Sequence, residues 1–340
     1  STFAVGFIAR PLGGVVFGHF GDQVGRKRTL VIALMMMGVA TTLIGLLPTY
    51  QSIGIVAPLM LVALRFVQGL AVGGQWGGAM LLVTESAPSE KRGWYGAYAQ
   101  AGAAVGVILA NLAFLAVSTS MSDEAFLDWG WRLPFIASIV LIGISLYVQL
   151  RMEDTEAFKA LKAAQAEADE QATVQKSPVL EAIRRYPRRI LLAAGAFLSV
   201  QVTFYILIAF VIAYGLNSPS VELTRDEMLT SVLFAAAAMI PALFYFSGMS
   251  DRVGRKQIYR WGAILTGVWG FALFPLIDTG SPLLITLAVT VGMIFLGMQY
   301  GPQAAYFTEL FSTEVRYSGA SLGYQIGAIL GGALAPTIAV

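Results

Sequence analysis

Long apolar runs of roughly twenty residues alternate with short polar loops along this 340-residue chain. A helix needs about 20 residues to cross the hydrocarbon of a bilayer, and the runs match that length. The pattern therefore predicts an all-α integral membrane protein with ten visible spans. We expect the spans near residues 1–18, 29–47, 55–83, 94–117, 132–150, 189–215, 227–247, 258–277, 283–307 and 318–338.

Composition supports this class and removes others. The chain is 57% hydrophobic and 12% charged, whereas soluble domains are about 25% charged. It has no cysteine, and His19 is its one histidine, so thiolate chemistry, a histidine-based metal site and a catalytic triad are excluded. With no paired deep acids or other catalytic set, we expect neither an enzyme nor a cofactor or metal.

Lysine and arginine are distributed unevenly between the two sides of the predicted membrane. Most of the 22 lie in loops on one side, whereas the opposite loops hold only Arg225. Basic loops stay on the cytoplasmic side. The distribution predicts a multi-pass protein of the cytoplasmic (inner) membrane. The charged segment 151–188 is then a cytoplasmic linker between an N-terminal half, 1–150, and a C-terminal half, 189–340.

The two halves carry the same landmarks in the same order. The loop Gly21-Asp22-Gln23-Val24-Gly25-Arg26-Lys27 recurs as residues 250–256, and residues 73–77 recur as 297–301. Glu85 and Arg92 recur as Glu309 and Arg316. Duplicated membrane proteins place their substrate site where the repeats face each other, so the repeat predicts a pseudo-two-fold axis and a site between the halves.

These motifs resemble those of a known family. Gly18-x-x-x-Asp22-Gln23-x-Gly25-Arg26-Lys27 and Arg65-x-x-Gln68-Gly69 resemble motifs of the major facilitator superfamily of transporters. Residues 9–14, 47–50, 74–79 and 130–135 resemble its metabolite:proton symporter branch, which carries shikimate, α-ketoglutarate, citrate and proline/betaine.

The resemblance implies two six-helix halves. The ten visible spans would be helices two to eleven of twelve, with the first and last helices absent and both ends of the chain truncated. It also implies a small-molecule substrate and protons as partners. We expect a monomer in the lipid bilayer, with no nucleic-acid partner.

Arg65, Gln68 and Gln75 share one face of the predicted helix 55–83. A cation within a span is costly unless it faces protein or water, so it marks a substrate pathway. The planar guanidinium suits a carboxylate, which favours an anionic or zwitterionic substrate. The alternative is a structural arginine satisfied by backbone carbonyls.

Further polar residues within other spans complete the predicted cavity. Gln299 is the repeat equivalent of Gln75, whereas Val289 stands at the position of Arg65. Any of these residues can instead bond a neighbouring helix. The remaining substrate-binding candidates are Asn111, Gln201, Tyr205, Gln299 and Gln303.

Charged residues gather at the predicted cytoplasmic ends of both halves. Asp22 and Asp251 can cap a helix N-terminus or pair with arginine. The resemblance implies that such groups latch the cytoplasmic ends while the carrier opens outward, and the alternative is a purely topological role. The gating candidates are Asp22, Arg26, Glu85, Arg92, Asp251, Arg252, Arg255, Glu309 and Arg316.

The predicted function is secondary active transport, by alternating access, of a small organic acid or zwitterion with protons. Gln75 stands where relatives often carry an acid, and no acid lies deep in any visible span. The coupling carboxylate is therefore expected on the absent first helix. An uncoupled facilitator or uniporter is the alternative, followed by a transporter-derived membrane sensor.

Overall fold

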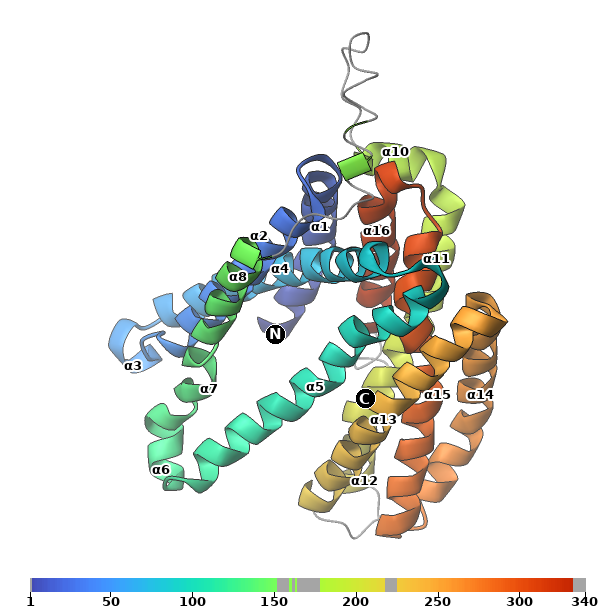
Figure 1. The fold of residues 1–340 in the computed structure, drawn as a ribbon. Helices are drawn as coiled ribbons and strands as arrows, with labels where there is room; N and C mark the ends of the chain where they lie inside the picture. The colour runs from blue at the N-terminus through green and yellow to red at the C-terminus, as the bar shows by residue number, and fades with distance from the viewer. Residues whose placement is uncertain (1, 152–158, 161–162, 164–177, 218–224, 333–340) are drawn as a thin grey trace. The chain divides into compact units, whose positions relative to one another are not determined.

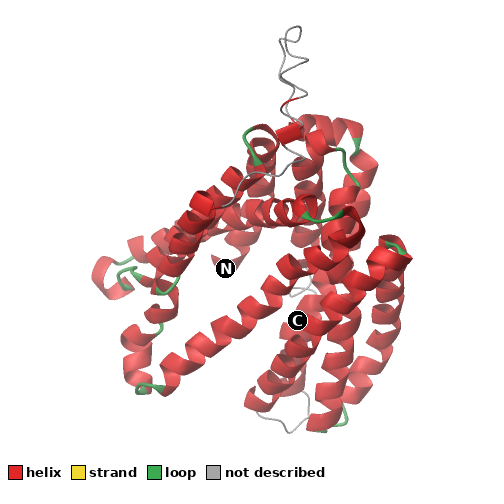
Figure 2. Cartoon of the chain, viewed as in Figure 1, coloured by secondary structure: helices red, strands yellow, loops and turns green. Residues whose placement is uncertain are grey.

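The computed structural model describes residues 2–151, 159–160, 163, 178–217 and 225–332. The described residues form helices joined by short loops, and no strand is found among them (Figures 1 and 2). The all-α prediction is confirmed. The helices are α1 Thr2–Gln23, α2 Arg26–Gly45, α3 Tyr50–Ile53, α4 Val56–Ser86, α5 Arg92–Thr119, α6 Asp123–Ala125, α7 Arg132–Ile136, α8 Ile139–Arg151, α10 Pro178–Arg185, α11 Pro187–Tyr205, α12 Val211–Asn217, α13 Arg225–Val253, α14 Arg255–Ile277, α15 Pro282–Glu309 and α16 Arg316–Gly332.

Irregular turns connect or interrupt some of these helices. The 3₁₀ turns η1, Ser89–Lys91, and η4, Thr313–Val315, lead into α5 and α16. The π turns η2, Phe126–Gly130, and η3, Ile206–Phe210, precede α7 and α12. As a result, the predicted span 189–215 consists of α11, η3 and α12 rather than one uniform helix.

In the described part of the chain, eight helical segments are long and apolar enough to cross a membrane. They match eight of the ten predicted spans. The other two predicted spans, 1–18 and 318–338, correspond to α1 and α16, which are helical but fall outside that set. The eight segments are 26–45, 56–86, 89–119, 123–147, 187–216, 227–253, 255–277 and 282–309.

Two glycines make the sharp turns of the repeated loop motif. Gly25 joins α1 to α2 with a φ of 131°, and Gly254 joins α13 to α14 with a φ of 105°. Side chains other than glycine rarely adopt a positive φ. Each turn holds the aspartate at the end of one helix close to the arginine at the start of the next.

The described residues divide into two compact units. The first unit contains residues 1–86, 109–192 and 310–326, and the second contains 87–108, 193–309 and 327–340. Each unit thus combines helices from both predicted halves. The halves 1–150 and 189–340 are defined by the repeat rather than by packing and stay a prediction. Most of the linker 151–188 lies outside the described residues, and α10 forms its end.

Within the first unit, α1 and α4 pack closely along glycines. A Cβ atom added at Gly69 would clash with the carbonyl oxygen of Gly6. One added at Gly73 would clash with the carbonyl oxygen of Arg10. Small residues allow this close approach of membrane helices. The contact places polar residues of α1 and α4 on one shared surface.

Candidate functional site

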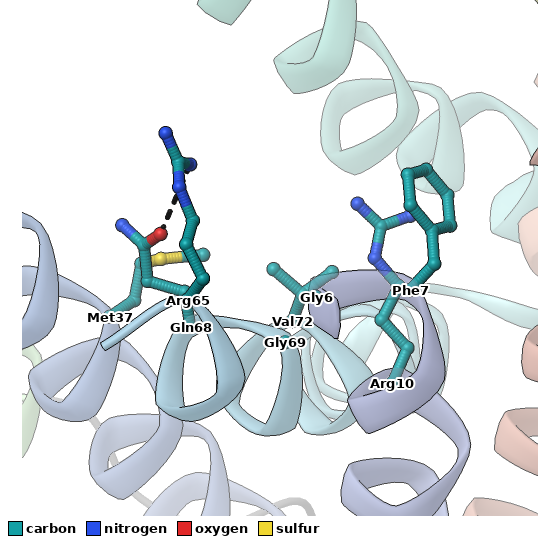
Figure 3. A pocket seen from close by; sticks show the side chains of 8 residues that line it. All are labelled: Gly6, Phe7, Arg10, Met37, Arg65, Gln68, Gly69 and Val72. Atoms are coloured by element: carbon teal, nitrogen blue, oxygen red, sulfur yellow. Dashed lines mark hydrogen bonds between the residues drawn. The ribbon is translucent and has the colours of Figure 1, made fainter. Parts of the chain in front are cut away.

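A pocket of about 190 Å³ lies in the first unit, where α1, α2 and α4 meet. Its volume is below the roughly 300–1,000 Å³ of pockets for drug-sized ligands, so it suits a small metabolite. Figure 3 shows two arginine side chains on the same side of α1 and α4, with Val72 between them. The lining residues are Gly6, Phe7, Arg10, Met37, Arg65, Gln68, Gly69 and Val72.

In the part of the chain that the structure describes, the Arg65 guanidinium bonds a side chain rather than the backbone. Its Nη1 donates to Oε1 of Gln68 at 3.2 Å, and Gln68 Nε2 donates to Oγ1 of Thr41 at 2.7 Å. Thr41 in turn donates to the carbonyl of Met37 at 2.7 Å. This chain of bonds orients the Gln68 oxygen toward Arg65. No other described residue accepts from the Arg65 guanidinium, so its remaining N–H groups can bond a ligand.

Arg132 provides a contrast. Its guanidinium donates to the carbonyl oxygens of Gly45, at 3.1 Å, and of Leu47. Such bonds to backbone carbonyls are what a purely structural arginine makes. Among the described residues, no backbone carbonyl accepts from Arg65. The structural alternative for Arg65 therefore describes Arg132 better.

Sequence reasoning missed Arg10 as a site residue. Its guanidinium carbon lies 4.1 Å from the ring centroid of Phe7, whose side chain is buried. This cation–π contact fixes the charge at the pocket wall opposite Arg65. The signal was present in the sequence, because Arg10 is a cation within the predicted span 1–18.

Of the two glutamines predicted to share a helical face with Arg65, only Gln68 lines the pocket. Gln68 and Val72 line the pocket with Arg65. Gln75, further along α4, is half-buried and donates to the carbonyl of Ala33 at 3.5 Å, outside the set of pocket-lining residues. Gln75 thus links α4 to α2.

The second unit holds the equivalent glutamine in a buried network. Gln299 on α15 is fully buried, and its Nε2 donates to Oγ1 of Thr266 at 2.8 Å. Its Oε1 accepts from Oγ of Ser199 at 3.0 Å. The network links α15 to α14 and α11. Gln303 is also fully buried, and in the described part of the chain its amide atoms have no hydrogen-bond partner.

The remaining candidates lie on other helices. Gln201 lies on α11, where its Cβ is 2.6 Å from the position of a Cβ added at Gly331. Tyr205 ends α11 directly before the π turn η3. Asn111 is exposed on α5. That these residues join Arg65 in one cavity stays a prediction.

The gating candidates form two charged clusters. In the first cluster, defined as Asp22, Arg26, Glu85 and Arg316, Asp22 accepts from the first turn of α16. Its carboxylate accepts from the backbone nitrogen and hydroxyl of Ser318 at 3.0 and 2.7 Å. Asp22 also pairs with Arg26 at 3.1 Å. One carboxylate thus caps a helix and neutralises a buried cation.

Backbone carbonyls and carboxylates surround the Arg26 side chain. It is fully buried and donates to the carbonyls of Gly21 and Thr313, both at 2.9 Å. Its Nε lies 3.7 Å from Glu85, which also pairs with Arg316 at 3.1 Å. A buried charge requires such pairing because its desolvation is expensive.

The second cluster is defined as Asp251, Arg255 and Glu309. Asp251 accepts from the backbone nitrogens of Gly93 and Trp94 in the first turn of α5, each at 2.9 Å. Arg255 pairs with Asp251 and, at 3.3 Å, with Glu309. The predicted capping and pairing roles are both found, since each repeated aspartate caps a helix from the other predicted half.

Two gating candidates, Arg92 and Arg252, lie outside both clusters. Arg92 is the repeat equivalent of Arg316, yet no ion pair of Arg92 is found among the described residues, and its buried Nε has no partner there. Arg252 is exposed at the end of α13. The second cluster therefore contains fewer charge contacts than the first.

Comparison with known proteins decides the family. The model of the Major Facilitator Superfamily matches residues 1–336. The chain belongs to this superfamily. The fold predicted from the repeated loop motif is therefore confirmed, and the superfamily comprises transporters rather than enzymes.

Named relatives of this superfamily member cover its whole length. It is 42% identical to the inner membrane metabolite transport protein YhjE of Escherichia coli K12 and 39% identical to the shikimate transporter of the same strain. Both alignments cover 100% of this chain and 76% of the relative. The structure of the proton:xylose symporter XylE superposes with a TM-score of 0.76 at 15% identity, covering 98% of this chain and 77% of XylE.

Proposed function

We propose that this superfamily member is a secondary active transporter that moves a small organic acid or zwitterion together with protons. The observation that carries the proposal is the pocket in which Arg65 lies beside Gln68, with guanidinium N–H groups that no other described residue accepts from. A guanidinium binds a carboxylate through two parallel hydrogen bonds. The 39% identical shikimate transporter, named for a carboxylic acid, supports this substrate class.

Transport then proceeds by alternating access. The two repeat halves, 1–150 and 189–340, rock about a substrate held near the midplane. Asn111, Gln201, Tyr205, Gln299 and Gln303 are the further substrate-binding residues that this proposal predicts. The two charged clusters latch the cytoplasmic ends, because each joins a loop of one half to the first turn of a helix from the other half.

The proposed location is the cytoplasmic membrane. The linker 151–188 and both copies of the basic loop face the cytoplasm, since basic loops are retained there. YhjE, which is named as an inner membrane protein and is 42% identical to this chain, supports the assignment. The protein acts as a monomer, with lipid as its surroundings.

Uptake into proteoliposomes tests the coupling. We expect labelled substrate to accumulate when the vesicle interior is alkaline, and a protonophore to abolish accumulation. The competing function is an uncoupled facilitator, which Gln75 favours because a neutral amide neither binds nor releases a proton. A facilitator would equilibrate substrate at the same initial rate with or without the pH gradient, and that result would contradict symport.

The same vesicles test the role of Arg65. We expect Arg65→Lys to impair uptake, because lysine keeps the charge but loses the planar fork. Arg65→Gln should impair uptake more. Arg184→Gln, at an exposed position on α10, is the matched control and should transport normally. Near-normal uptake by inserted, folded Arg65→Gln would assign Arg65 a structural role.

A further inference from the structure

The face of α16 that meets α1 and α4 is centred on one buried tyrosine. Tyr317 is 0% exposed, and its hydroxyl donates to the carbonyl oxygen of Gly74 on α4 at 2.6 Å. Its backbone nitrogen donates to the carboxylate of Asp22, at the end of α1, at 3.3 Å. The side chain and the backbone of one residue thus bond two neighbouring helices. Neither the ring nor the hydroxyl belongs to the charged clusters.

The ring of Tyr317 fills a socket built from glycines of α1 and α4. A Cβ atom added at Gly21 or Gly77 would clash with the ring, and one added at Gly78 would lie 2.8 Å from the hydroxyl oxygen. Glycines let membrane helices approach closely, and here they leave room for a whole aromatic side chain. The glycine socket is defined as Gly21, Gly74, Gly77 and Gly78.

The equivalent interface of the second unit has neither the ring nor the complete socket. Gly93 stands at the repeat position of Tyr317, and a Cβ atom added there would clash with the carbonyl oxygen of Ser247. The ring and its socket therefore occur together in one copy of the interface and are replaced together in the other. Three of the four socket glycines are replaced in the second repeat, by Ser250, Met298 and Pro302.

We propose that Tyr317 is a gating residue, whose ring holds the cytoplasmic end of α16 in the glycine socket and leaves it when the carrier opens to the cytoplasm. The bond from Tyr317 to Gly74 joins helices of the two repeat halves, which separate at that end during alternating access. The equilibrium between the closed and open forms then depends on an uncharged contact as well as on the charged clusters. The inference rests on the proposed transport function and adds this contact to its latch.

Tyr317→Phe isolates the contribution of the hydroxyl. The variant keeps an aromatic ring in the socket, and Gly74, as an interior residue of α4, keeps the helical partner of its carbonyl. No buried acceptor is therefore left unsatisfied, so we expect the variant to fold. A neutral hydrogen bond changes an equilibrium constant about 2- to 12-fold, and the open population should rise by that factor.

Two single-cysteine reporters measure this population, because the chain has no cysteine of its own. Ser321, on α16, lies one turn before Gln325, which donates to a backbone carbonyl of α4 at 3.2 Å. Ala97, on α5, lies one turn before Gln100, which donates to a backbone carbonyl of α15 at 2.8 Å. Ser321 and Ala97 are both 0% exposed. Ser321→Cys and Ala97→Cys thus place one thiol in each interface between the repeat halves, each within a different unit.

The rate at which each thiol reacts with N-ethylmaleimide in detergent-purified protein tests the proposal without substrate or a pH gradient. We expect Tyr317→Phe to accelerate labelling of both reporters by the same factor, about 2- to 12-fold, because one opening exposes both interfaces. Tyr317→Leu, which also removes the ring, should accelerate both further. A merely structural role would loosen α16 locally and accelerate labelling of Ser321→Cys alone.

Tyr259 provides the matched control. It is 6% exposed, and its hydroxyl donates to the carbonyl oxygen of Ala196 at 2.7 Å, so it makes the same kind of bond as Tyr317. That bond joins α14 to α11, which both belong to the C-terminal half. Because the loss of a bond within one half affects the closed and open forms alike, Tyr259→Phe should leave both labelling rates unchanged.

Unchanged labelling of both reporters in Tyr317→Phe, or faster labelling of Ser321→Cys alone, would overturn the proposal. Equal acceleration by Tyr259→Phe would also overturn it, since the effect would then follow from the loss of any buried hydroxyl bond. If Tyr317→Leu does not fold, the rates in Tyr317→Phe still decide.

The failure of this proposal is distinct from that of the transport proposal. Gradient-driven uptake by the unaltered protein, with labelling that is indifferent to Tyr317, would contradict only the gating role of Tyr317. Parallel acceleration of both reporters without gradient-driven uptake would contradict only proton coupling.

Discussion

Arg26 and Arg255 occupy equivalent positions in the two copies of the loop motif, yet their surroundings differ. The side chain of Arg26 is 0% exposed and contacts Asp22, Glu85 and two backbone carbonyls. The side chain of Arg255 is 12% exposed, and its partner Glu309 is 36% exposed. In contrast, Asp22 and Asp251 both accept from backbone nitrogens in the first turn of a helix.

The difference separates two properties that the motif alone does not distinguish. Capping depends on the aspartate and the following glycine turn, which both copies contain. Charge pairing depends on what surrounds the arginine. In the first cluster, η4 supplies the Thr313 carbonyl and Arg316 shares Glu85. In the second, Arg92 makes no equivalent pair in the described part of the chain.

Arg26→Gln should destabilise the protein more than any other single substitution in the two clusters. It leaves Asp22 and Glu85 buried with less compensation, and removing one partner of a buried pair costs about 3–5 kcal/mol. Arg255→Gln should cost about 1 kcal/mol, because its pairs are nearer to solvent. Thermal unfolding of the two purified variants in detergent measures the difference.

Equal destabilisation by the two substitutions would contradict this comparison. Arg252, which is exposed in the second copy of the loop motif, provides the control. Arg252→Gln should leave the unfolding temperature close to that of the unaltered protein. A double variant, Arg26→Gln with Glu85→Gln, should recover part of the loss, because the second buried charge is then removed as well.

Asp22→Asn and Asp251→Asn should lower the rate of transport more than they lower the affinity for substrate. Asparagine keeps an oxygen that caps a helix but loses the charge that pairs with Arg26 or Arg255. Each change therefore shifts the conformational equilibrium rather than a ligand contact. We expect Asp22→Asn to slow turnover about tenfold, which corresponds to about 1.4 kcal/mol, and Asp251→Asn to slow it less.

Uptake rates at saturating substrate, compared with calorimetric affinities, check this prediction. A large loss of substrate affinity with normal turnover at saturation would contradict the latch hypothesis. A greater loss of turnover in Asp251→Asn than in Asp22→Asn would show that the second cluster contributes more to the latch than the first.

Much of this arrangement could be predicted from the sequence, because it depends on local features. Apolar run length located eight helical spans, and the repeat identified Glu85 and Arg316 as end-of-span charges, which the structure brings within 3.1 Å of each other. The capping role of Asp22 also follows from residue type. Which helix it caps does not, since Ser318 lies far away in the sequence and only tertiary packing brings it near.

The candidate pocket shows the same limit. Arg65 and Gln68 are predictable as neighbours because one helical face brings them together. Arg10 lies on a different helix, and only the close approach of α1 and α4 at Gly69 and Gly73 makes it a neighbour of that face. Gln75 shares the helical face in projection, but it bonds the carbonyl of Ala33 instead. Helical periodicity describes one helix at a time and cannot supply such contacts.

Among the substitutions in the two clusters, Glu309→Gln should change the unfolding temperature least. The dependence of that change on salt tests whether the second cluster is more exposed to solvent than the first. Glu309 is 36% exposed and contacts Arg255 at 3.3 Å, and exposed ion pairs contribute about 0–1 kcal/mol. Its removal should lower the unfolding temperature slightly at low ionic strength and have no measurable effect at about 1 M salt, where the Debye length is about 3 Å. Glu85→Gln, at a side chain only 2% exposed, should destabilise the protein at both salt concentrations, because solvent ions do not reach the pair it breaks. If Glu309→Gln lowered the unfolding temperature equally at low and high salt, the Glu309–Arg255 pair would behave like the buried pairs of Glu85. The two clusters would then not differ in their exposure to solvent ions.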